Sequence, residues 1–209
     1  MADNKTRKLT PKEQRRLEKI SKIISHKEAE GYKRTDLTIS IVKANVVATV
    51  ACVVLIALSS VLYSIIYGDY IANYSWKLIL FLFISFAIHE FIHGFFWGIF
   101  ASEHAKSIEF GFIVKMFTPY CTCLEPLGKW QYLIGCVMPG VILGLFPYIT
   151  AFIIGNTSML FYGVVMLVGA AGDTMIMYKL LRFKSEAKDV IFMDHPTECG
   201  LIVLEKINE

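Results

Sequence analysis

The chain has 209 residues, of which 55% are hydrophobic and 19% are charged, and its formal net charge is +3. A soluble domain of this size is normally about half apolar and about a quarter charged, so the composition argues against a water-soluble protein. The sequence contains no glycine-rich phosphate loop, no internal repeat and no nucleic-acid-binding motif, and we therefore expect no nucleic-acid partner.

The N-terminal residues 1–39 are polar and basic, and they predict an amphipathic helix at the membrane surface. Thr10 is a suitable N-cap, Pro11 suits the first helical position, and Glu13 completes a Thr-x-x-Glu capping box. Apolar residues then recur on one face among basic ones, and Gly31 can end the helix. Such a helix favours contact with the anionic lipids of a bilayer. A solvated charged tail is the alternative.

Four apolar blocks follow, and each is long enough to cross a bilayer. Crossing about 30 Å of hydrocarbon takes about 20 helical residues at about 1.5 Å each. Because the first 36 residues are polar, we expect no cleavable signal peptide. The predicted fold class is an all-α polytopic membrane protein with four transmembrane helices, at residues 40–66, 78–101, 131–154 and 158–181.

Lysine and arginine are distributed unevenly around these spans. Residues 1–36 contain eleven of them against six acidic residues, whereas 68–77 contain one and 155–157 none. By the positive-inside rule, both termini and the loop 102–130 are expected in the cytoplasm, and the protein in the cell membrane. The predicted organisation is a basic interfacial segment, a four-span membrane domain whose core follows the first span, and a cytoplasmic tail, at 1–39, 40–182 (core 78–182) and 183–209.

The second span contains His89, Glu90 and His93, which are costly residues at membrane depth. An ionisable group there usually faces the interior of the bundle and has a function. On a helix, His89 and His93 project from one face and can hold one metal ion, with Glu90 beside it. In a His-Glu-x-x-His motif the imidazoles bind zinc and the carboxylate takes a proton from water. A structural hydrogen-bonded cluster between helices is the alternative.

A catalytic zinc ion needs a third protein ligand and one open position. Apart from Glu90, the predicted spans contain one acidic residue, Asp173. Asp173 and His93 each lie eight residues from the cytoplasmic end of their spans, so both lie about 12 Å deep. The small residues at 169–172 let two helices approach closely. We predict one zinc ion per chain, bound by His89, His93 and Asp173, with Glu90 as the catalytic base. Other divalent ions also suit these ligands.

Two further features are candidates for binding a substrate. Pro139 in the third span frees a backbone carbonyl and kinks the helix, either shaping the site or making an ordinary membrane-helix kink. The alternating segment 107–117 predicts a short strand or hairpin at the cytoplasmic interface, between the second and third spans. Its edge, at Ile108 and Phe110, could hold a substrate chain extended by main-chain pairing. A hairpin that only covers the site is the alternative.

The five cysteines do not predict a disulfide framework. Cys121 and Cys123 fall in a segment assigned to the reducing cytoplasm, where free thiols are the default. Without a second pair of cysteines they are a weak metal-binding signal, so we expect free thiols.

Together these motifs resemble a bacterial family known as "putative zincin peptidase". The resemblance covers about residues 80–202 and rests on His89-Glu90-x-x-His93, the Tyr120-Cys121 loop with Glu125-Pro126, the Pro139 span, Gly172-Asp173 and the tail Asp194-His195-Pro196. That family is similar in plan to the site-2 proteases, which cleave substrates within the membrane. The resemblance implies His89 and His93 as zinc ligands, Glu90 as general base and Asp173 as third ligand. One departure is that Gly172 precedes Asp173, whereas the site-2 pattern usually has a glycine after the aspartate.

The sequence thus predicts a zinc-dependent intramembrane endopeptidase. Its substrate would be a membrane protein, cleaved in or near a membrane segment, with the active site open towards the cytoplasm. A zinc-binding scaffold or pseudoprotease without hydrolytic activity is a different class of hypothesis, and its function would survive Glu90→Gln. A metal transporter is a weaker third hypothesis, because no polar residues continue a path from the site to the outer side.

Overall fold

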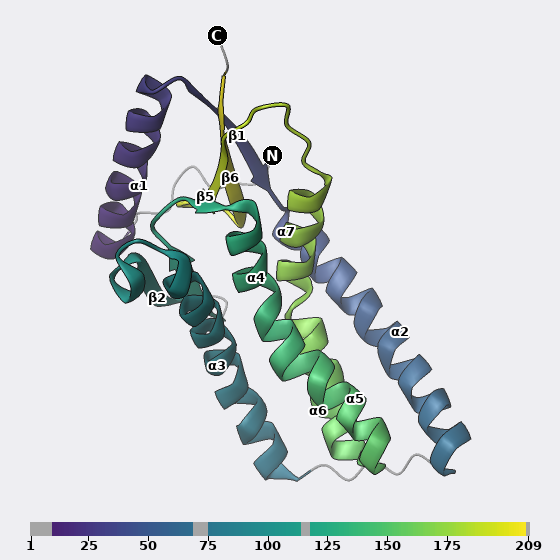
Figure 1. Ribbon diagram of the computed structural model, residues 1–209. Coiled ribbons are helices and arrows are strands. Elements are labelled where there is room, and N and C mark those ends of the chain that lie inside the picture. The colour runs from purple at the N-terminus through teal and green to yellow at the C-terminus, as the bar shows by residue number, and fades with distance from the viewer. Residues whose placement is uncertain (1–9, 69–74, 114–117, 208–209) are drawn as a thin grey trace.

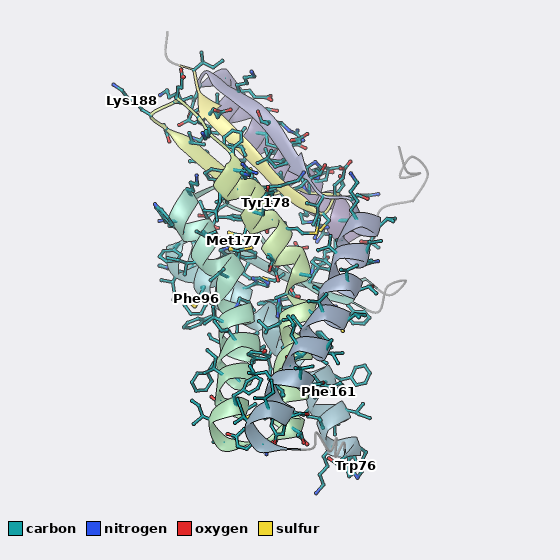
Figure 2. The ribbon with its side chains drawn as sticks, turned by 90° about the vertical axis from the view of Figure 1, so that its right-hand side faces the viewer. Trp76, Phe96, Phe161, Met177, Tyr178 and Lys188 are labelled. Carbon is teal, nitrogen blue, oxygen red and sulfur yellow. The ribbon has the colours of Figure 1, made fainter. Side chains whose placement is uncertain are left out.

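The computed structural model describes residues 10–68, 75–113 and 118–207. Long helices form a bundle at one end of the molecule, and strands and helix α1 lie at the other end (Figure 1). Figure 2 shows this arrangement from the side, with Trp76 at the bundle end and Lys188 at the sheet end. The N-terminal and C-terminal segments therefore meet at one end of the bundle. The cytoplasmic placement of that end stays a prediction.

Among the described residues, three helices are long and apolar enough to cross a membrane, and a bent helix pair makes a fourth candidate. The predicted spans agree with these elements to within a few residues, and the helices fit a membrane protein. They are α2 (Ile41–Tyr67), α3 (Trp76–Phe100), the segment Lys129–Ile154, and the pair α6 (Thr157–Gly169) and α7 (Ala171–Arg182). The segment Lys129–Ile154 consists of α4 (Lys129–Pro139), a π-helical stretch (Gly140–Leu145) and α5 (Phe146–Ile154).

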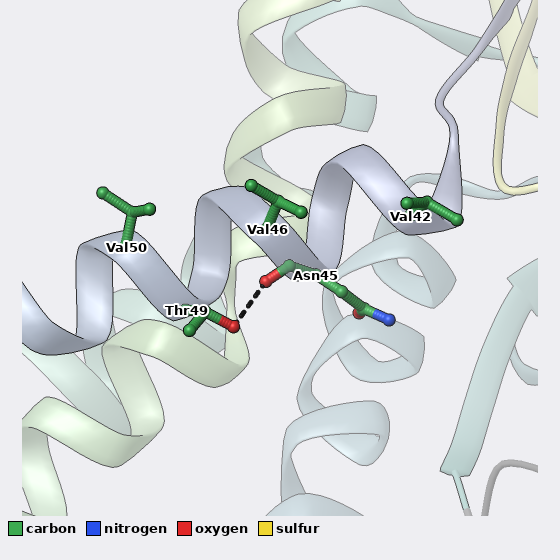
Figure 3. A pocket seen from close by; sticks show the side chains of 5 residues that line it. All are labelled: Val42, Asn45, Val46, Thr49 and Val50. Carbon is green, nitrogen blue, oxygen red and sulfur yellow. Dashed lines mark hydrogen bonds between the residues drawn. The ribbon is translucent and has the colours of Figure 1, made fainter.

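Helix α2 exposes most of its apolar side chains. Val42 near its start is 70% exposed and Ile65 near its end is 76% exposed, an arrangement that suits contact with hydrocarbon along the whole helix. One face of α2 carries a shallow open groove of about 340 Å³, lined by Val42, Asn45, Val46, Thr49 and Val50 (Figure 3). The Thr49 hydroxyl donates to the Asn45 carbonyl oxygen at 2.8 Å, so this hydroxyl is satisfied within its own helix. None of the predicted site residues lines the groove.

The third and fourth spans are not regular helices. In the third, α4 ends at Pro139, which lacks an N–H for the α-helical ladder, and a π-helical stretch follows. The fourth predicted span, at 158–181, coincides with a candidate span that is broken, because α6 and α7 meet at 48°. Ala170 leaves helical geometry there (φ −82°, ψ 11°). Gly169 beside it packs so closely on Phe86 that a Cβ would lie 3.0 Å from the ring.

The fold is mostly helical, as predicted, but the prediction of an all-α fold with one hairpin is incomplete, because the described part of the chain also contains a four-stranded antiparallel sheet. Its strand order is β1-β6-β5-β4. Strand β1 pairs with β6 over seven residues, so main-chain hydrogen bonds hold the N-terminal segment and the C-terminal tail side by side. The strands are β1 (Tyr32–Thr38), β4 (Leu127–Gly128), β5 (Val190–Asp194) and β6 (Gly200–Lys206).

Strand β6 is the buried centre of this sheet. Its apolar run from Leu201 to Leu204 is fully buried. Alternate side chains point to opposite faces of a strand, and accordingly Ile202 and Leu204 pack towards helix α1 whereas Leu201 and Val203 pack among α3, α4 and α7. In a sequence, a short apolar run can belong to a buried strand or to a buried helix. The burial of both faces of β6 explains why residues 201–204 are all apolar.

Helix α1 (Pro11–Ala29) covers the outer face of the sheet. The predicted capping box is confirmed: the Glu13 N–H donates to the Thr10 hydroxyl at 3.3 Å, and the Glu13 carboxylate accepts from the Thr10 N–H at 2.8 Å. Ile20 and Ile24 are buried against the sheet, in a cluster with Met193 and others. The apolar face of α1 thus packs on protein. Contact of its basic residues with anionic lipid stays a prediction.

The hairpin predicted between the second and third spans is present as strands β2 (Ile108–Ile113) and β3 (Thr118–Cys123), which pair antiparallel. Residues 114–117 of the predicted segment 107–117 lie outside the described residues. A short 3₁₀ helix (His104–Ser107) precedes β2. The Glu125 carboxylate fixes this junction, because it accepts hydrogen bonds from the Ser102 N–H at 2.8 Å, the Ser102 hydroxyl at 2.5 Å and the Ser107 hydroxyl.

Candidate metal centre

Helix α3 places His89 and His93 one turn apart, with both side chains buried inside the bundle. They are 5% and 4% exposed, and their ring centroids lie 4.9 Å apart. Both Nε2 atoms face the carboxylate of Asp173. The distance is 3.0 Å from His89 Nε2 to Oδ2 and 3.4 Å from His93 Nε2 to Oδ1. The three side chains predicted as metal ligands are therefore in direct contact.

Asp173 reaches the histidines because the fourth span is broken. It lies in the first turn of α7, just after the 48° bend. Close packing supports the bend: a Cβ on Gly140 would lie 3.2 Å from the Cβ of Ala170. The small residues predicted to let the helices approach do so at Gly169, whereas Gly172 has open space where a Cβ would be. The glycine before Asp173 is therefore not required by close packing.

The hydrogen bonds of His93 show that this donor set suits a cation. The carbonyl oxygen of Gly135 can only accept, so His93 Nδ1 donates its proton to it, at 2.8 Å. In the neutral ring, Nε2 then carries a lone pair and faces a carboxylate oxygen. Two acceptors facing each other need a positive charge between them, either a proton or a metal ion. Two imidazole nitrogens, one of them oriented by a backbone carbonyl, and one carboxylate are a usual ligand set of zinc. The residues present fit the ion.

Glu90 lies beside this group, on the side that faces strand β3. Ligand atoms of His89, Glu90 and His93 lie within 4.8 Å of one another. The Glu90 carboxylate also accepts a hydrogen bond from the backbone of Cys121. Glu90 is thus close enough to act on a molecule bound at the centre, and β3 fixes the position of its carboxylate.

The pairing of β2 with β3 shows which strand edge meets the centre. Opposed residues of an antiparallel pair either exchange main-chain hydrogen bonds or point these groups outward. Phe110 and Cys121 are opposed. The Phe110 carbonyl oxygen accepts from Lys12 Nζ at 2.5 Å, and the Cys121 backbone bonds Glu90, so this pair points outward. Helix α1 therefore occupies the outer edge of β2, and the outer edge of β3 faces the centre.

The three residues predicted as weak substrate contacts lie around the centre. Ile108 and Phe110 pack on α3 next to His93, where a Cβ on Gly94 would lie 2.8 Å and 2.5 Å from their side chains. Pro139 is buried at the end of α4, one turn after Gly135. The structure thus brings all of the predicted residues to one region, and their roles in binding a substrate stay predictions.

Sequence reasoning missed a layer of side chains behind the histidines. Trp97 stacks on His93, with ring centroids 5.0 Å apart and an interplanar angle of 14°, and its Nε1 donates to the Tyr132 carbonyl oxygen at 3.1 Å. Gly135 is packed against Trp97 so tightly that a Cβ would lie 2.1 Å from the ring. The position of Trp97, four residues after His93, is the one signal that could have indicated this layer.

A family model described as "Putative zincin peptidase" matches residues 82–188, about half of the chain. The chain belongs to this family, and the name of the family indicates a zinc metallopeptidase. No curated protein and no solved structure matches the chain. The matched range includes the four predicted site residues but ends before β5 and β6, so the tail motif at 194–196 lies outside it.

Proposed function

We propose that the protein is a zinc-dependent endopeptidase that cleaves a membrane protein in or near one of its membrane segments, in the manner of the site-2 proteases. One observation carries the proposal. The Nε2 atoms of His89 and His93 converge on Asp173 inside a bundle of helices long and apolar enough to span a membrane. Ionisable groups are retained at such depth when they have a function.

The roles of the side chains follow from their positions. His89, His93 and Asp173 would hold one zinc ion per chain, and that ion would supply Lewis-acid activation of water and of the scissile carbonyl. Glu90 accepts the proton of the attacking water and then donates it to the leaving amine. The Cys121 backbone holds the Glu90 carboxylate in place for both transfers.

A substrate chain must be extended for its peptide bond to reach this centre, and a strand edge provides main-chain partners for it. The edge at Ile108 and Phe110 was predicted for this purpose, but Lys12 holds the Phe110 carbonyl. The edge of β3 at Cys121 is the one that faces Glu90. The outward N–H groups of Cys121 and Cys123 already bond Glu90 and Asp194, so we propose that a substrate chain donates its N–H groups to the outward carbonyl oxygens of β3. Ile108 and Phe110 of β2 hold this hairpin on α3, and the site opens towards the cytoplasm.

The test is metal content and hydrolysis, measured on the detergent-purified full chain. We compare wild type, Glu90→Gln and Asp173→Ala, with Glu186→Gln as an exposed control. Zinc per chain is measured by mass spectrometry, and cleavage of single-span membrane peptides is followed in ¹⁸O-labelled water, which labels one new carboxyl group per cut.

We expect one zinc in wild type and in Glu90→Gln, much less in Asp173→Ala, and cleavage only in wild type and the control. Zinc in wild type with equal cleavage by Glu90→Gln would refute the role of Glu90. Zinc without cleavage in any sample would favour a zinc-binding scaffold. No zinc in folded wild type would refute the peptidase.

A further inference from the structure

Asp194, the last residue of β5, is a buried carboxylate that the proposed chemistry does not use. Its side chain is 8% exposed, and a charge at such a place costs free energy unless it is hydrogen-bonded. Oδ2 accepts from the Cys123 N–H at 2.8 Å, and Oδ1 accepts from the Tyr132 hydroxyl at 2.5 Å. Burial raises the pKa of Asp194, and these two bonds act against that rise.

The bond to Cys123 fixes the strand edge that holds Glu90. Cys121 and Cys123 are two residues apart on β3, so their N–H groups point the same way. The Cys121 N–H bonds Glu90 and the Cys123 N–H bonds Asp194. At about 3.4 Å per residue, the two carboxylates hold the same edge at points about 7 Å apart. A shift of the strand at Cys123 therefore moves the partner of Glu90.

The bond to Tyr132 fixes the helix that orients His93. Tyr132 is 1% exposed, and its carbonyl oxygen accepts from Trp97, which stacks on His93. One turn further along α4, Gly135 accepts the Nδ1 proton of His93. The hydrogen bond from the Tyr132 hydroxyl to Asp194 thus fixes the position of α4. This position sets the contact of Gly135 with His93 and the hydrogen bond that holds Trp97 against His93.

We propose that Asp194 is a positioning residue of the metal centre, which sets the partner of Glu90 and the partners of His93 at the same time. The C-terminal strands β5 and β6 lie outside the range that the family model matches. They would then help to position the residues of the metal centre. The inference rests on the proposed function for its kinetic consequence, but its structural content needs neither metal nor substrate.

The test compares Asp194→Ala, Asp194→Asn and Tyr132→Phe in the full chain in detergent. Asparagine can accept from the Cys123 N–H and donate to the Tyr132 hydroxyl, so it serves as the conservative rescue. Asp189→Ala is the control, because Asp189 also accepts from a tyrosine hydroxyl, that of Tyr32, in the same sheet. Zinc affinity, kcat, KM and the amide exchange of residues 118–124 are measured for each.

In Asp194→Ala we expect zinc affinity to fall by about 10-fold or more, kcat to fall by about 100-fold, and amide exchange at 118–124 to become faster. Asp194→Asn recovers all three values, and Tyr132→Phe loses zinc affinity alone. The control behaves as wild type.

Two results would overturn the inference. One is folded Asp194→Ala with wild-type zinc affinity and kcat, and the other is unchanged exchange at 118–124. The exchange experiment decides the matter even where wild type binds no zinc or cleaves nothing, outcomes that would refute the proposed peptidase instead.

Discussion

Replacing Gly135 by alanine is the sharpest test of how the metal centre is supported. A Cβ at this position would lie 2.1 Å from Cδ1 and Nε1 of Trp97, whereas ordinary contact begins at 3.4 Å. In a close-packed interior the ring or helix α4 must therefore move by about 1 Å or more. Trp97 stacks on His93, and the Gly135 carbonyl orients the same imidazole. Either movement displaces His93.

Two effects of opposite sign set the size of the change in stability. Overpacking costs about 1–3 kcal/mol, and replacing a helical glycine by alanine returns about 0.5–1 kcal/mol. We therefore expect Gly135→Ala to lose about 1–2 kcal/mol of unfolding free energy. Loss of a group that orients a metal ligand lowers metal affinity by about 10–100-fold, so zinc binding should suffer more than folding does.

The assay is a zinc titration against a chelating indicator, with thermal unfolding of the same detergent-purified samples. Gly172→Ala is the matched control, because it adds the same methyl group next to Asp173 where nothing lies within 4 Å. We expect it to keep wild-type zinc affinity and to gain up to about 1 kcal/mol of stability. Wild-type affinity in Gly135→Ala would refute the argument that Gly135 and Trp97 hold His93 in place.

Three further predictions concern the pH dependence, the contacts of α1 and the metal. Partial burial acts to raise the pKa of Glu125, but hydrogen bonds from Ser102 and its neighbours outweigh this effect and lower the pKa to about 2. A depressed folded pKa gives stability that is complete above the unfolded value and is lost as pH falls, so Tm should drop between about pH 4.5 and pH 2, and Glu125→Gln should make this drop smaller. Arg16 pairs with Glu109 at 3.5 Å, with both side chains largely buried; Arg16→Ala should cost about 1–3 kcal/mol in thermal unfolding, and less in a Glu109→Gln background. Chelation of zinc should lower Tm by the equivalent of about 2.7 kcal/mol at a zinc concentration of 100 Kd, and should leave Tm unchanged in Asp173→Ala.

The sequence was sufficient to predict which ionisable residues of the membrane spans lie together. His89 and His93 lie one helical turn apart, and helical periodicity requires them to share a face. Asp173 was the acidic residue left in the spans, and its distance from the span end matched that of His93. Ionisable groups are rare at membrane depth, so each of them has few possible partners. A match between the depths of two such groups therefore strongly predicts that they are in contact.

Contacts between segments that are far apart in the chain could not be predicted from the sequence in this way. Strand β1 resembled the end of a charged segment, because Tyr32 and Leu37 are its only apolar residues and its partner β6 lies more than 160 residues away. The break at Ala170 follows from packing of Gly169 on Phe86, which no local propensity indicates. Asp194 carries no pattern of its own, since its donors come from β3 and α4.

The pairing of β1 with β6 fixes an order of events during synthesis. Asp36 of β1 pairs with Ile202 of β6, which is synthesised more than 160 residues later. At a rate of synthesis of about 5–20 residues per second, this delay is about 8–30 s. Throughout that interval the spans can insert, but β1, the apolar face of α1 and the Asp194 anchor have no completed sheet to join. The proposed metal centre would therefore reach its working geometry only after β5 and β6 have emerged from the ribosome. Under the proposed function, a nascent chain would be unable to cleave neighbouring membrane proteins until its own synthesis had passed that point.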